Sequence, residues 1–82
     1  MHRPLHIRTS TQTDPDTAPQ IRVSIIGGPY ARLYAYPFAV PDAHRWAAER
    51  FVDELASLIG AGELTETARH VDGATFALGG HE

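Results

Sequence analysis

The sequence of 82 residues contains neither cysteine nor lysine. Without cysteine, no disulfide bond and no thiolate-bound metal can stabilise the fold. A chain this short then depends on good packing and on association with other copies, and we expect a homodimer. The N-terminal residues also lack the apolar core of a signal peptide, so a cytoplasmic protein is expected.

Long apolar runs and an excess of positive charge are missing as well. No stretch approaches the roughly 20 apolar residues that a membrane-spanning helix needs. The sequence contains seven arginines and ten acidic residues, and this excess of negative charge argues against general binding to nucleic-acid phosphates. The five histidines have no metal-ligand spacing, and no nucleophile lies beside a recognisable base. We therefore expect no catalytic residues, no metal ligands and no cofactor.

The first 20 residues are expected to form an N-terminal arm and linker. Residues 1–8 alternate in polarity and fit either an edge strand or a flexible arm. Residues 9–20 are rich in Thr, Asp and Pro and contain no large apolar side chain. Such a segment buries too little surface to offset the entropy of ordering, so we expect a flexible linker or a long loop.

Residues 21–27 and 29–36 alternate in polarity, are rich in strand-forming residues and flank a Gly-Gly-Pro turn, so they predict a hairpin. A three-residue loop pairs Val23 with Leu33 and separates the two faces cleanly, whereas a two-residue loop mixes them. One expected face is aliphatic and consists of Ile21, Val23, Ile25, Ala31, Leu33 and Ala35. The other consists of Arg22, Ser24, Ile26, Tyr30, Arg32, Tyr34 and Tyr36.

Residues 42–59 form the one long amphipathic helical stretch. Pro41 and Asp42 favour its start, and the glycines after Ile59 favour its end. The side expected to face the core carries His44, Ala48, Phe51, Val52, Leu55, Leu58 and Ile59. Trp46 and Arg50 lie on the opposite side.

Two of these helical side chains have alternative interpretations. His44 is either a half-buried residue bonded to a loop carbonyl or a titrating group beside Tyr36 and Phe38. Trp46 either packs at the rim of the core or contacts another molecule.

Residues 63–78 predict a second hairpin around an Asp72-Gly73 turn, although 63–70 also fit a short helix. The expected inward face of this hairpin is Val71, Ala74, Phe76 and Leu78. The predicted fold is a two-layer α+β domain spanning 21–79. An antiparallel sheet of four or five strands carries one helix on one face, in ββαββ order, and 80–82 form a tail.

One helix covers only one face of a sheet, so the other face should be open and rich in tyrosine and arginine. The candidate binding residues are Arg22, Tyr30, Arg32, Tyr34, Tyr36, Trp46 and Arg50. We expect a non-enzymatic protein-binding module with an accessory or regulatory role, acting through the open face, an edge strand or the Trp46 side. The alternative is a single-stranded nucleic-acid binder that uses the tyrosine-arginine face, although the net charge of −3 counts against it.

Overall fold

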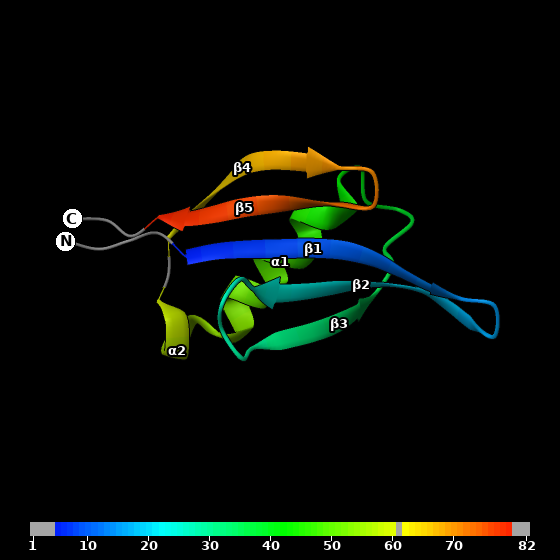
Figure 1. The fold of residues 1–82 in the computed structure, drawn as a ribbon, viewed down its shortest axis with the longest axis horizontal. Helices are drawn as coiled ribbons and strands as arrows, with labels where there is room; N and C mark the ends of the chain where they lie inside the picture. The colour runs from blue at the N-terminus through cyan, green and yellow to red at the C-terminus, as the bar shows by residue number, and fades with distance from the viewer. Residues whose placement is uncertain (1–4, 61, 80–82) are drawn as a thin grey trace.

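Five antiparallel strands form one sheet, and a helix packs against one of its faces (Figure 1). The computed structural model describes residues 5–60 and 62–79, so the first four residues of the expected arm and the expected tail at 80–82 lie outside the described residues. The elements are β1 (Leu5–Asp14), β2 (Thr17–Ile25), β3 (Ala31–Ala35), α1 (Ala43–Glu54), α2 (Ala56–Ile59), β4 (Glu63–His70) and β5 (Gly73–Gly79). Their order across the sheet is β3-β2-β1-β5-β4. The predicted two-layer α+β fold with an antiparallel sheet is confirmed, with five strands. The strand β1 precedes the predicted ββαββ order, so the sheet begins at Leu5 and not at residue 21.

Strand β1 is the middle strand of the sheet, so the prediction of a flexible linker at 9–20 is wrong. Its threonines are β-branched, which favours extended backbone even where no large apolar side chain is present. Pairing with β2 on one side and β5 on the other satisfies its backbone groups from both directions. The turn to β2 is closed by the Asp16 N–H, which donates to Asp14 Oδ1 over 2.9 Å. Tertiary pairing thus orders a segment whose composition favours a loop.

The register of β2 and β3 differs from the predicted one by one residue. Val23 lies opposite Arg32 and Ile21 opposite Tyr34, because the loop spans residues 26–29 and is one residue longer than expected. Gly27 has a φ of 80°, which suits glycine, and the Ile25 N–H donates to the Tyr30 carbonyl over 3.1 Å to close the loop. A shift of one residue exchanges the two faces of a strand.

Helix α1 is capped by Asp42, whose carboxylate accepts from the Arg45 N–H over 3.2 Å. The predicted helix is interrupted at Leu55, and the short α2 follows before Gly60 ends it with a φ of 84°. Most of the predicted core side of α1 is buried, whereas Leu58 on α2 is 61% exposed. The buried apolar side chains are Ile7, Ile21, Val23, Ile25, Ala43, Ala47, Ala48, Phe51, Val52, Leu55, Leu64, Ala74, Phe76 and Leu78.

The second hairpin forms, but its turn is Val71-Asp72, since His70 pairs with Gly73. The predicted inward position of Val71 is therefore wrong, and its side chain is fully exposed at the turn. The other three predicted inward residues, on β5, are buried. Gly73 begins β5 where that strand comes closest to the backbone of Thr9, which leaves no space for a side chain.

Candidate functional site

Four of the seven predicted binding residues gather around Glu54, on the helix-covered side of the sheet. We call this group the Glu54 cluster: Arg32, Tyr34, Trp46, Arg50 and Glu54. The Tyr34 hydroxyl donates to Glu54 Oε1 over 2.7 Å, and Arg32 Nη1 lies 3.5 Å from the same oxygen. Arg50 Nη2 lies 3.6 Å from Glu54 Oε2. Glu54 therefore joins the end of α1 to edge strand β3.

The aromatic rings complete this cluster. The rings of Tyr34 and Trp46 meet edge to face, with centroids 6.2 Å apart, and Arg50 Cζ lies 5.6 Å from the centre of the Trp46 ring. Burial, and then the hydrogen bond to Glu54, raises the pKa of the Tyr34 hydroxyl above its ordinary value of 10.0. Trp46 packs against the core, as one of its two interpretations proposed. The cluster connects β3 to the helix, because Glu54 is contacted by Arg32 and Tyr34 from β3 and by Arg50 from α1.

The other three predicted binding residues lie apart from the Glu54 cluster. Tyr36 packs against Phe38 and His44, at centroid distances of 4.9 and 6.4 Å. Tyr30 lines a hollow of about 380 Å³ beside the start of β3. Arg22 lies on the uncovered face, since its neighbours Ile21 and Val23 are buried beneath the helix. The predicted open face of tyrosine and arginine is therefore wrong, because the register shift turns Arg32 and Tyr34 toward the helix.

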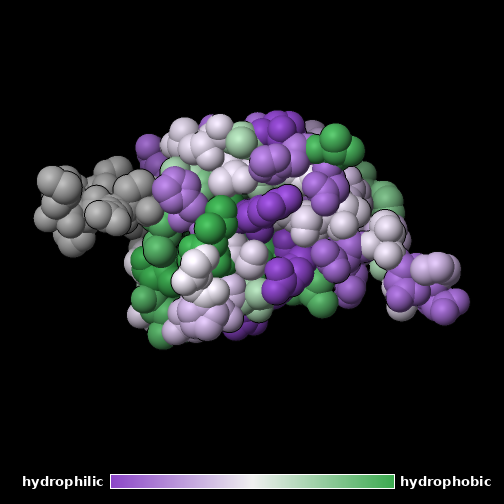
Figure 2. Space-filling model, viewed as in Figure 1, coloured by the Kyte–Doolittle hydropathy of each residue, from purple (hydrophilic) through white to green (hydrophobic). Residues whose placement is uncertain are grey.

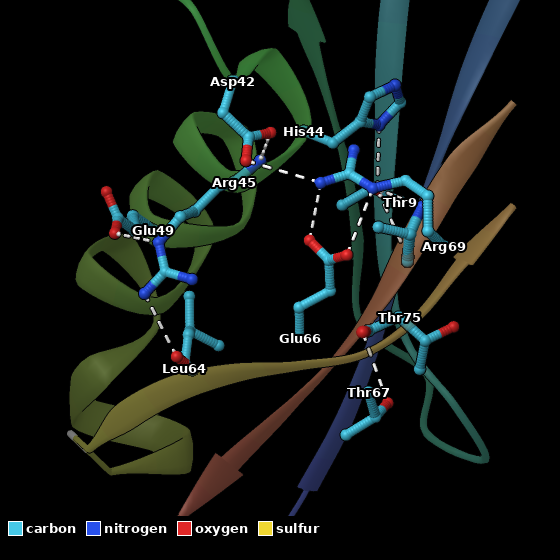
Figure 3. A network of polar contacts seen from close by, with 11 residues as sticks. Thr9, Asp42, His44, Arg45, Glu49, Leu64, Glu66, Thr67, Arg69 and Thr75 are labelled. Atoms are coloured by element: carbon cyan, nitrogen blue, oxygen red, sulfur yellow. Dashed lines mark hydrogen bonds and ion pairs between the residues drawn. The ribbon is translucent and has the colours of Figure 1, made fainter.

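A buried threonine and a histidine form a second polar group, shown in Figure 3. Thr9 is 0% exposed, and its hydroxyl donates to the Ala74 carbonyl and accepts from the Ala74 N–H, over 3.3 and 3.1 Å. Nδ1 of His44 lies 2.8 Å from the Thr9 oxygen, and Nε2 lies 3.2 Å from the Thr11 hydroxyl. A neutral ring protonated at Nδ1 satisfies all of these groups. The expected loop-carbonyl partner of His44 is thus replaced by two strand hydroxyls.

The ionisation of His44 should make stability depend on pH. Burial, and then the charge of Arg69, lowers the His44 pKa below its ordinary value of 6.5. Between the folded-state pKa and about pH 6.5 the unfolded chain therefore binds a proton that the folded chain does not bind. The stabilisation is complete above about pH 6.5 and is lost as the pH falls from there toward the folded-state pKa.

We expect this effect to be absent from His44→Gln, which keeps a polar side chain but does not titrate. The free energy of unfolding, measured with urea at about pH 7.5 and 5.5, should fall more in the parent than in the variant. If the free energy of unfolding depends on pH equally in the parent and in the variant, then the His44 pKa is the same in the folded and unfolded states. His70→Gln, at an exposed position, is the matched control.

Ion pairs connect the start of α1 to β4, on the same side of the sheet (Figure 3). Arg69 contacts both Glu66 oxygens, with Nη2 at 2.6 Å, and its Nη2 lies 3.5 Å from Asp42 Oδ2. Arg45 Nε donates to Glu49 over 3.1 Å, and its Nη2 donates to the Leu64 carbonyl over 3.1 Å. The helix side of the molecule thus contains paired charges of both signs.

The uncovered face of the sheet has a different composition. Helix α1 lies behind the sheet in Figure 1, so Figure 2, drawn from the same direction, shows this face. Strongly hydrophilic side chains lie over the middle of the sheet, and hydrophobic ones gather near α2 and the β2–β3 turn. The register places Arg8, Arg22 and hydroxyl side chains on the central strands and Leu33 on β3. None of the three tyrosines lies on the strands of this face, and its rings within the described residues are the imidazoles of His6 and His70.

The two edges of the sheet differ in how well they are protected. Two backbone hydrogen bonds join the residues on either side of β3 to β2: the Ile25 N–H donates to the Tyr30 carbonyl, and the Tyr36 N–H donates to the Pro19 carbonyl. Backbone direction alternates along a strand, so Ala31, Leu33 and Ala35 point their N–H and C=O groups away from β2. Strand β4 has a bulge between Glu66 and Ala68 and is contacted by Arg45, and both features discourage further pairing.

Comparison with known proteins identifies no relative: no protein-family model, no curated protein and no solved structure matches this chain. Neither helix in residues 5–60 and 62–79 is long and apolar enough to cross a membrane. Over the same described ranges, no three His, Asp or Glu side chains gather where they could hold a metal ion.

The sequence contained partial signals for the residues that were missed. Glu54 follows Arg50 by four positions, which indicates an ion pair on a helix but not a partner on β3. Thr9 belongs to an alternating threonine series, typical of a strand. Leu33 is predicted in the core because the favoured register is the one that separates apolar from polar faces. The observed register pairs Val23 with Arg32, as a two-residue loop would, but through a loop of residues 26–29.

Proposed function

We propose that this chain is a small non-enzymatic protein-interaction module that works as a homodimer, with two copies pairing through β3. The observation that carries the proposal is the unprotected edge of this strand. Leu33, at its centre, is 55% exposed, and it is flanked by two exposed alanines. An exposed strand edge with apolar side chains is a template for pairing with another strand.

The residues of β3 suit antiparallel pairing about a two-fold axis at Leu33. Leu33 then lies opposite Leu33 of the second copy, and Ala31 lies opposite Ala35. These residues carry the outward backbone groups, so each pair exchanges N–H and C=O hydrogen bonds. The two Leu33 side chains bury apolar surface against each other at the centre of the interface. The small side chains of Ala31 and Ala35 let the two β3 backbones come close together. On the helix side, Arg32 lies opposite Tyr34 of the second copy.

A recess beside this edge supports the same arrangement. The hollow of about 380 Å³ is bounded by Tyr30, Arg32, Leu55 and Leu58. It can accept side chains that follow β3 in the second copy. Pairing over five residues buries less surface than a typical permanent interface, so we expect a dissociation constant in the micromolar range.

An accessory or regulatory role in the cytoplasm is part of this proposal. Small size and the lack of cysteine support it. The internal pairing of the Glu54 cluster and of His44 supports a structural role for the polar groups on the helix side, in keeping with a non-enzymatic module.

The solution mass tests the proposed dimer. Sedimentation measured from about 1 to 500 μM should show a monomer-dimer equilibrium, and the amides of Ala31, Leu33 and Ala35 should exchange hydrogen more slowly as concentration rises. Leu33→Glu should give a monomer at every concentration, since it places two like charges at the centre of the interface.

Val71→Glu is the matched control, because it also replaces an exposed apolar residue with glutamate but lies at the β4–β5 turn. This variant should dimerise like the parent. A parent that stays monomeric throughout would overturn the proposal. So would a dimer that survives Leu33→Glu.

A further inference from the structure

Two arginines lie side by side on the uncovered face of the sheet. Arg8 pairs with Ser24, and Arg22 pairs with Ser10, so the arginines occupy diagonal positions on the adjacent strands β1 and β2. Side chains at such positions are about 7 Å apart, well within the reach of two guanidinium groups. Both side chains are exposed, whereas their chain neighbours Ile7, Thr9, Ile21 and Val23 are buried on the other face.

These two arginines differ from the other four in the described part of the chain. Arg32, Arg45, Arg50 and Arg69 each contact a carboxylate. Among the described residues, neither Arg8 nor Arg22 has such a contact.

The cross-strand neighbours of this pair carry no negative charge: Ser10, Ser24, Leu33 and Thr75. Two adjacent positive charges repel each other, and an anion placed between them removes that repulsion.

We infer that Arg8 and Arg22 form an anion-binding site that holds the carboxylates of an acidic, partly apolar segment of another protein. The guanidinium group offers a planar pair of donors that matches a carboxylate. The hydroxyls of Ser10 and Ser24 add donors beside it. This inference goes beyond the proposed dimer and does not depend on it.

The surroundings of the pair favour a peptide as the ligand. Arg22 lies directly opposite Leu33, so an aliphatic surface adjoins the basic pair. A segment that alternates acidic and apolar side chains matches both surfaces. A nucleic acid would bring phosphates, but no tyrosine, phenylalanine or tryptophan lies on the described strands of this face to stack with its bases. Two copies of this face repel each other through the arginine pair, so a second copy is not the expected occupant of this site.

Fluorescence anisotropy with a labelled peptide of alternating glutamate and valine tests the inference. At low salt the parent should bind this peptide, and added salt should weaken the binding. The double variant Arg8→Gln/Arg22→Gln should bind at least about tenfold more weakly, the equivalent of about 1.4 kcal/mol. A peptide with glutamine in place of glutamate should not bind.

Arg50→Gln/Arg69→Gln is the control, because it removes the same charge from the helix side and should change the affinity by less than about twofold. An equal loss in this control would overturn the inference in favour of unspecific attraction. Tighter binding of oligothymidylate than of the acidic peptide would overturn it in favour of nucleic acid. No binding of the acidic peptide would identify the pair as an ordinary solvated surface. Self-association lost in Arg8→Gln/Arg22→Gln would overturn it in favour of a second copy as the occupant.

Discussion

Gly73→Ala is expected to lower the melting temperature and the free energy of unfolding strongly. A Cβ at Gly73 would overlap the Thr9 carbonyl group, which belongs to the backbone of the central strand and cannot rotate away. Either β1 and β5 separate or the β4–β5 turn distorts, at a cost of about 3 kcal/mol or more. A chain of this size has a total stability of about 4–12 kcal/mol, so a loss of about 3 kcal/mol removes about a quarter to three quarters of it. Circular dichroism during thermal unfolding would measure the change.

Gly79→Ala is the matched control for this prediction. Gly79 lies in the same strand, and a Cβ there would meet nothing within 4 Å. Its effect should stay below about 1 kcal/mol. A folded Gly73→Ala protein with the melting temperature of the parent would show that β1 and β5 approach less closely than described.

Phe51→Ala should have the next largest effect. The ring is 0% exposed and lies where α1 meets the sheet. Its removal loses apolar burial and leaves a cavity, and such changes cost about 3–5 kcal/mol. Unfolding in urea should show a lower midpoint with a similar slope.

Leu58→Ala provides the comparison, because sequence periodicity places Leu58 on the same helical side as Phe51. In the structure Leu58 is 61% exposed, so its truncation should cost less than about 1 kcal/mol. A cost for Leu58→Ala close to that of Phe51→Ala would mean that the helix continues regularly past Leu55 and buries both residues.

Local sequence signals predicted those parts of the fold that depend on neighbouring residues. Asp42 caps the helix because its side chain needs only the N–H of Arg45. Phe51 and Val52 are buried because helical periodicity determines which residues share a side. The alternation in 21–36 likewise identified both strands of the hairpin.

The errors arose where distant residues decide the structure. The register shift of one residue exchanged the two faces of β3. Tyr34 rather than Leu33 lies on the helix side, where it contacts Trp46 and Glu54. The segment around Thr9 is ordered because β5, some 65 residues away, supplies the partner for its hydroxyl and its backbone. The amino-acid composition of a segment describes only that segment. It contains no information about a partner that is distant in the sequence, such as Trp46 for Tyr34 or β5 for Thr9.

The central position of β1 also determines when the sheet can be completed. β1 is translated first, and its neighbour β5 follows 65 residues later, which takes several seconds at about 5–20 residues per second. Until then the middle strand is an edge strand, with Ile7 and Thr9 exposed to any other extended chain. The pairing of β1 with β5 is distant in sequence, so it should also be a slow step in refolding. Arg8, Thr9 and Ser10 lie in the part of β1 that later pairs with β5, and their polar side chains should keep that temporary edge solvated until β5 is made.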